Sequence, residues 1–405
     1  MDLDIATTVK LGSYIGAGFC IGLGAIGAAL GEGYTAGLAN QGISENPSKS
    51  GDIIKNMLVG QAVAESAGIF ALVVAILLIF IKFPMATPLK AAAMLGAGLS
   101  MGAGAIGSGI GSGYPGGGAC LGIARQPAVS GRLTTNMLIG SAVCQTPAIF
   151  SLVIAMMLLF LDFGKGAISP TWAALLGAGM CMGFGAIGSG IGSGYPGGEA
   201  CLGIARQPAI SGRLTTNMLI GSAVCQTPAI FSMVVALMLL FLDFGKAPVS
   251  PTWAALLGAG IATGVAAIGS GMGGGMAAGA SCEGIARNPE TFGQVTTTML
   301  VGQAVAQTPS ILGLLVSFIL IFKTFPEALT LAPAMALLGA GICTGFGGIG
   351  PGIGNGMTAE GAVMWVARNV GVTGVLMRTM LVGQAVSQST AIYAMVISLV
   401  LIFVV

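Results

Sequence analysis

The sequence has no histidine, and only 7% of its 405 residues are charged. Without histidine, most protein metal sites and the Ser-His and Cys-His nucleophile pairs are excluded. None of the many GxG patterns is followed by the lysine and Ser/Thr of a phosphate-binding loop, so we expect no nucleotide chemistry in this chain. The formal net charge of +2 gives no reason to expect a nucleic-acid partner.

Apolar residues, at 55%, and glycine, at 69 residues, are abundant instead. Apolar runs long enough to cross a bilayer recur about ten times. Glycine at this frequency, without the period of collagen, indicates membrane helices whose backbones pack closely. The eight cysteines lie inside these apolar segments without a CxxC pair, so we interpret them as small packing residues. The expected fold class is an all-α membrane protein.

An internal repeat divides the chain into five units. A Met-Leu pair marks the same point in each, at Met57, Met137, Met218, Met299 and Met380. Each unit has a glycine-rich apolar segment, a short polar loop and a second apolar segment, which predicts a helical hairpin. We expect five tandem hairpins at residues 1–85, 86–166, 167–247, 248–328 and 329–405. The ten helices are expected near 11–41, 53–82, 91–123, 133–161, 172–204, 214–242, 253–286, 294–323, 332–367 and 375–404.

The basic residues indicate how the hairpins are oriented. Every arginine lies in or beside the loops inside the hairpins, where nine basic residues occur. The opposite side has six, all lysine: Lys10, Lys82, Lys90, Lys165, Lys246 and Lys323. The positive-inside rule therefore predicts that the loops inside the hairpins are cytoplasmic and that both termini lie on the opposite side.

The first helix of each unit has glycine at very short intervals, for example at Gly22, Gly24, Gly27 and Gly31. Such a helix is nearly smooth on more than one face and can contact like neighbours on both sides, as the inner wall of a closed ring requires. Close packing in an ordinary transporter bundle is the alternative, and glycine alone does not exclude it. The equal length of the repeats favours the ring.

One ionisable group, Glu65, lies near the middle of the second apolar segment of the first unit. A carboxyl group in hydrocarbon costs at least ~2–3 kcal/mol, which indicates a function. Glu32 is expected at a similar depth, Gln61 lies one turn from Glu65 on the same face, and Ser66 and the Val63 carbonyl add oxygen atoms. We predict an oxygen-rich site for Na⁺ or H⁺ in which at least one carboxyl is protonated. The alternative interpretation is a buried carboxyl pair that shares a proton and has only a structural role.

These features together resemble the c subunits, or proteolipids, of rotary ATP synthases and ATPases. The resemblance rests on the repeated hairpins, the glycine-rich first helix, the ARQP and ARNP loops and the glutamate in VGQAVAES, and it covers the whole chain. It implies a membrane ring in which Glu65 carries Na⁺ or H⁺, with Glu32, Ser66 and the Val63 carbonyl as its companions. Glu32 with Ser66 is closer to the sodium-binding branch of that family.

The resemblance also implies partners. They are other c subunits or further copies of this chain, a stator a subunit, central-stalk subunits and membrane lipid. Any ATP chemistry would belong to those partner subunits. The loop residues that would face the stalk are Arg125, Gln126, Arg206, Gln207, Arg287, Asn288, Arg368 and Asn369.

The other four units lack the carboxylate. Each has glutamine at the position of Glu65, followed by a hydroxyl residue. Glutamine has the shape of a protonated glutamate but cannot ionise, so we interpret four pairs as degenerate sites: Gln145 with Thr146, Gln226 with Thr227, Gln307 with Thr308, and Gln388 with Ser389. Pro147, Pro228 and Pro309 follow, and each frees a carbonyl four residues earlier that the glutamine amide could satisfy.

We weigh three functions. The preferred one is a fused rotor-ring subunit with one carrier per five hairpins, which lowers the ion-to-ATP ratio and favours pumping over synthesis. The second is a structural or accessory ring or pore protein derived from a c subunit, with little transport of its own. The third is a secondary transporter, which fits less well because many transporters have inverted repeats whereas these hairpins share one orientation.

Overall fold

The computed structural model describes residues 4–81, 87–163 and 169–403. The expected hairpin boundaries at 85 and 166, and the lysines Lys82 and Lys165, lie outside these ranges. Every regular element in the described ranges is a helix, which confirms the all-α class. The helices are α1 (Ile5–Glu45), α2 (Ser50–Phe80), α3 (Pro88–Arg125), α4 (Ser130–Phe160), α5 (Thr171–Arg206), α6 (Ser211–Cys225), α7 (Thr227–Phe241), α8 (Val249–Arg287), α9 (Phe292–Ala306), α10 (Thr308–Phe322), α11 (Ala332–Arg368) and α12 (Thr373–Phe403).

Ten spans of 34 to 39 residues in this part of the chain are long and apolar enough to cross a membrane. The pairs α6–α7 and α9–α10 are each one span, interrupted only at Gln226 and Gln307. The first helix of the chain begins earlier than the sequence predicted, because the Asp4 carboxylate accepts a hydrogen bond from the Thr7 amide at 2.7 Å and caps it. Inside each hairpin, one 3₁₀ turn joins the two helices: Pro47–Lys49, Pro127–Val129, Pro208–Ile210, Pro289–Thr291 and Val370–Val372.

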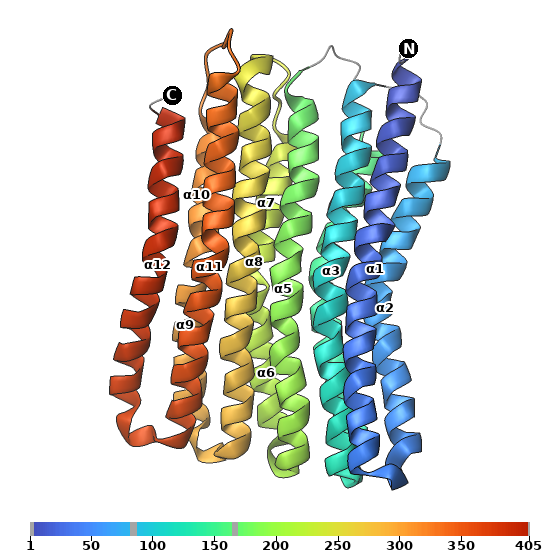
Figure 1. The fold of residues 1–405 in the computed structure, drawn as a ribbon, viewed down its shortest axis with the longest axis vertical. Coiled ribbons are helices and arrows are strands. Elements are labelled where there is room, and N and C mark those ends of the chain that lie inside the picture. Colours follow the sequence, from blue (N-terminus) through green and yellow to red (C-terminus); the bar gives the residue numbers. More distant parts are fainter. Residues whose placement is uncertain (1–3, 82–86, 164–168, 404–405) are drawn as a thin grey trace.

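The hairpins stand side by side in chain order and form two layers (Figure 1). The first helices, α1, α3, α5, α8 and α11, contact one another along their length, whereas neighbouring second helices contact each other much less. The first layer is therefore the more tightly spaced one, and the double layer is an arc with α1, α3, α5, α8 and α11 on its concave side. The two termini lie at the same end of the helices but at opposite edges of the arc (Figure 1).

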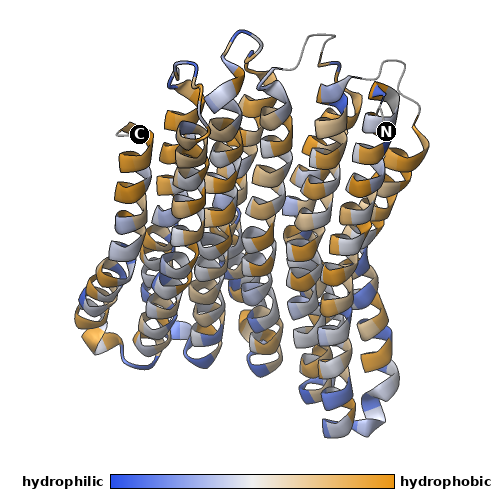
Figure 2. Ribbon diagram, turned by 45° about the horizontal axis from the view of Figure 1, so that its top comes forward, coloured by the Kyte–Doolittle hydropathy of each residue, from blue (hydrophilic) through white to orange (hydrophobic). Residues whose placement is uncertain are grey.

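Glycine allows the close spacing of the first layer. A Cβ atom on Gly27 would lie 2.4 Å from the Ala105 carbonyl oxygen, and one on Gly107 would lie 2.5 Å from the Ala186 carbonyl oxygen. These are backbone atoms that cannot move aside, so only glycine fits at these contacts. Hydrophilic residues concentrate toward the ends of the helices, and the spans between them are largely apolar (Figure 2).

Candidate functional site

Three of the glutamines predicted to be degenerate reach across the boundary to the preceding hairpin, a boundary that we call a seam. The Gln145 amide nitrogen donates to the Val63 carbonyl oxygen of hairpin 1 at 3.0 Å and to the Ser112 hydroxyl of its own hairpin at 2.8 Å. Gln226 donates in the same way to Val143, and Gln307 to Val224, each at 3.0 Å. The position equivalent to Glu65 is therefore shared between two hairpins.

This geometry shows which hairpin supplies the glutamine at each freed carbonyl. The carbonyls freed by Pro147 and Pro228, those of Val143 and Val224, do accept from a glutamine amide, but the glutamine belongs to the following hairpin. The Val63 carbonyl likewise accepts from Gln145. Within one chain, the Val63 carbonyl therefore takes part in the seam with hairpin 2, and its role beside Glu65 stays a prediction.

Around Glu65 the structure brings together only part of the predicted set. The Gln61 amide donates to the Glu32 backbone carbonyl at 3.2 Å, which holds α1 and α2 together at this level. The Ser66 hydroxyl donates to its own helix, to the Ala62 carbonyl at 3.2 Å. Glu65 itself is exposed, on a face of hairpin 1 that no other described hairpin covers.

In hairpin 5 an asparagine, in place of the glutamine, donates the hydrogen bond to the preceding hairpin. Asn355, at the position of Glu32, donates from its side-chain amide to the Val305 carbonyl of hairpin 4 at 3.3 Å. The side chain of Gln388, at the position of Glu65, has no hydrogen bond within the described part of the chain. The sequence contained a signal for the role of Asn355, because Pro309 frees the Val305 carbonyl.

Two further glutamines join the seams and were missed by the sequence argument. Gln303 and Gln384 are fully buried and stand at the position of Gln61 in hairpins 4 and 5. The Gln303 amide donates to the Gly221 and Gly274 carbonyls at 2.9 and 3.0 Å. The Gln384 amide donates to the Gly302 and Asn355 carbonyls, both at 3.0 Å. Both occupy the same position in the repeat as Gln61, and this equivalence could have identified them from the sequence.

At the loop end, the predicted stalk-facing arginines are exposed. Arg125 forms an ion pair with Glu45 of hairpin 1 at 3.1 Å, and Arg287 pairs with Glu283 of its own helix. Arg368 lies against the ring of Trp365, 4.5 Å from its centroid. Amide side chains link the loops across seams as well, since Asn46 donates to the Ala124 carbonyl at 3.0 Å and Asn288 to the Ala367 carbonyl at 3.3 Å. The stalk contact of these loops stays a prediction.

Comparison with known proteins adds an independent observation. The sequence pattern of the family of ATP synthase C subunits matches five segments, at residues 15–78, 95–158, 176–239, 257–320 and 338–401. Over 67 residues, 16% of this chain and 70% of the relative, the chain is 55% identical to the ATP synthase c subunit of Petrotoga mobilis. It is 32% identical over 202 residues, 50% of this chain and 84% of the relative, to the A-type ATP synthase K subunit of Methanocaldococcus jannaschii. It is 52% identical over 65 residues, 16% of this chain and 76% of the relative, to the ATP synthase c subunit of Thermotoga maritima.

Proposed function

Because the chain belongs to the family of ATP synthase C subunits, we propose that it is the rotor-ring subunit of an ion-translocating rotary ATP synthase or ATPase, with Glu65 as its single ion carrier. One observation carries the proposal. Of the five equivalent positions, only that of Glu65 has an ionisable side chain, and it lies at an edge of the arc, whereas Gln145, Gln226 and Gln307 are engaged in seams inside the chain.

The carried ion is Na⁺ or H⁺. Glu65, Glu32 and Gln61 offer carboxylate and amide oxygens, which suit a hard cation, and a carboxyl can equally load a proton. A glutamine can neither bind a proton nor balance the charge of a cation in hydrocarbon. One carrier among five hairpins gives a low ratio of ions to ATP, which favours ATP-driven pumping against a steep gradient.

The partners follow from the family. A stator a subunit would exchange ions with Glu65, and central-stalk subunits would contact the exposed loop arginines at the cytoplasmic end. Both termini would lie on the opposite side of the membrane, by the positive-inside rule. The ATP chemistry would take place in those other subunits, and this chain would be non-catalytic.

Carbodiimide labelling tests the carrier role, because carbodiimides react with protonated carboxyls in apolar surroundings. Purified protein in detergent is labelled across pH, with and without Na⁺, and the labelled peptides are identified by mass spectrometry. Labelling of Glu65 that Na⁺ slows indicates a sodium site, and labelling that ignores Na⁺ but falls with rising pH indicates a proton carrier. The Glu65→Gln variant is the control. Absence of label at Glu65 under every condition would overturn the carrier role and favour the structural ring protein.

A further inference from the structure

The connection between hairpins 4 and 5, residues 323–331, borders a cavity at the end of the helices where both termini lie (Figure 1). The connection is anchored on the start of α8, where the Ala328 amide donates to the Ser250 carbonyl at 3.1 Å. The walls of the cavity come from this connection, the starts of α8 and α11 and the end of α12. Its volume of about 470 Å³ lies within the range of roughly 300–1,000 Å³ that is usual for small-molecule sites.

Two side chains of opposite charge, Lys323 and Glu327, line this cavity. They do not pair with each other, and neither forms an ion pair with another residue of the described ranges. The Lys323 ammonium donates to the Ile402 carbonyl at 3.0 Å and lies 4.1 Å from the centroid of the Phe403 ring. Because an ammonium has three N–H groups, it can donate further hydrogen bonds to a ligand. The cavity therefore offers one cationic donor and one anionic acceptor.

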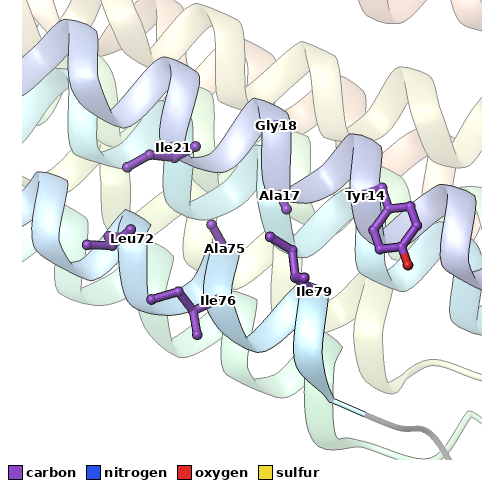
Figure 3. A pocket seen from close by; sticks show the side chains of 8 residues that line it. All are labelled: Tyr14, Ala17, Gly18, Ile21, Leu72, Ala75, Ile76 and Ile79. Atoms are coloured by element: carbon purple, nitrogen blue, oxygen red, sulfur yellow. The ribbon is translucent and has the colours of Figure 1, made fainter.

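This pair of charges is specific to one connection. In the preceding connection, the positions of Lys323 and Glu327 are occupied by Leu242 and Lys246, so the pair is not a property of the repeat. A second groove, between α1 and α2, provides a contrast (Figure 3). None of the eight residues that line it is charged, and it has no means of orienting a polar ligand.

The surroundings of the cavity are those of a membrane interface. Leu329 of the connection is fully exposed, and Phe322 and Phe403, at the ends of α10 and α12, are 60% and 61% exposed. Large apolar side chains exposed together indicate contact with lipid in a chain with ten membrane spans. A lysine that directly follows a span extends its ammonium toward the headgroups. Phe322 and Phe403 belong to the second layer, on the convex side of the arc, so a ligand in the cavity can reach the hydrocarbon there.

We propose that this cavity binds the headgroup of phosphatidylethanolamine, a zwitterionic phospholipid, from the leaflet opposite the loops inside the hairpins. The lipid phosphate accepts from the Lys323 ammonium, the lipid ammonium donates to the Glu327 carboxylate, and the acyl chains lie along Phe322 and Phe403. The carboxylate disfavours an anionic lipid, and a choline headgroup has no N–H group to donate. The site does not involve Glu65, so it is tested independently of ion transport.

Native mass spectrometry of the purified chain in detergent tests the site. Phosphatidylethanolamine, phosphatidylglycerol and phosphatidylcholine with the same acyl chains are added, and the affinity of each is measured. The parent should bind phosphatidylethanolamine most tightly. Glu327→Gln should weaken that lipid about tenfold, the effect of replacing a charged hydrogen bond by a neutral one, and remove its advantage over phosphatidylglycerol. Lys323→Gln should weaken all three lipids, and Lys323→Arg should retain binding. Lys246→Gln, at the position of Glu327 in the preceding connection, is the matched control and should change none of the affinities.

Equal affinities of the parent for the three lipids would overturn the proposal, as would an equal loss of binding in Glu327→Gln and Lys246→Gln. Phosphoethanolamine in solution should not displace the lipid, and displacement would assign the cavity to a soluble ligand instead. Lys323→Gln also removes the donor to the Ile402 carbonyl, so the melting temperature of each variant is measured beside its affinity. Glu327 has no hydrogen bond in the described ranges, so Glu327→Gln decides the question even where Lys323→Gln fails to fold.

Discussion

The amide nitrogen of Gln145 donates to the carbonyl oxygen of Val63, 3.0 Å away and 82 residues earlier in the chain. The bond joins the second helices of hairpins 1 and 2 at the level where Glu65 lies. Gln226 and Gln307 repeat it at the next two seams, at the same distance. A side chain that cannot ionise is thus a hydrogen-bond donor between hairpins.

Removing one of these donors should destabilise the chain. In Gln307→Leu, the Val224 carbonyl loses its donor at a point where Pro228 has already taken away the helical one. An unsatisfied buried carbonyl costs about 1–3 kcal/mol, so the variant should unfold at a lower temperature in the same detergent. Gln388→Leu is the matched control, because the Gln388 side chain has no hydrogen bond in the described ranges. The melting temperature of this variant should stay near that of the parent protein. Equal melting temperatures of the two variants would contradict this role.

Restoring the carboxyl should create a second carrier. In Gln226→Glu the protonated carboxyl can still donate to the Val143 carbonyl, so the fold should be kept. Carbodiimide should then label two positions per chain, 65 and 226, as counted by intact-mass spectrometry. Gln226→Ala is the control and should show one label. A single label in Gln226→Glu at low pH would mean that the seam inside the chain excludes an ionisable group.

Loss of the carboxyl in hairpin 1 should affect transport and leave the fold intact. Glu65→Gln places in hairpin 1 the residue that its counterparts already have, so we expect a change in unfolding free energy below about 1 kcal/mol. Ion transport driven by ATP in the reconstituted complex should fall to background. Glu360→Gln, a change outside the Glu65 position, should retain transport. Transport that survives Glu65→Gln would rule out a single carrier.

Alanine substitution at two equivalent glycines should change the stability of the chain in opposite directions. Gly113→Ala forces a Cβ against the Gly31 carbonyl oxygen and should cost about 1–3 kcal/mol of chain stability. Gly33→Ala meets open space in the single chain and should stabilise α1 slightly, by up to about 1 kcal/mol. Thermal unfolding of the two variants in the same detergent measures both effects, and a melting temperature of Gly33→Ala as low as that of Gly113→Ala would contradict the open position.

The sequence predicted the architecture well because its repeat is nearly constant in length. The Met-Leu pairs located five hairpins, and the glycine spacing indicated first helices with contacts on both sides. The prolines indicated which carbonyls are freed, and those of Val143 and Val224 do accept from a glutamine amide, whereas that of Val305 accepts from Asn355.

The partner across each seam could not be predicted in the same way. Gln145 and Val63 differ by one repeat and two residues, and nothing in one hairpin determines whether an amide points to its own helix pair or to a neighbour. The choice depends on the curvature of the arc, which arises from the contacts of all five first helices. The Val63 carbonyl accepts from Gln145 of the next hairpin, and its grouping with Glu65 stays a prediction, whereas the Gln61 amide and the Glu32 backbone carbonyl, which belong to one hairpin, do meet.

The short connections between hairpins have a consequence for assembly. The four seams between neighbouring hairpins form within one chain, so their effective concentration is set by tether length, in the millimolar range for short flexible links, and not by the amount of protein in the membrane. A contact between separate molecules additionally loses translational and rotational freedom, at a cost of several kcal/mol. Within this chain, the proportion of ionisable to non-ionisable hairpins is therefore determined by translation of a single message.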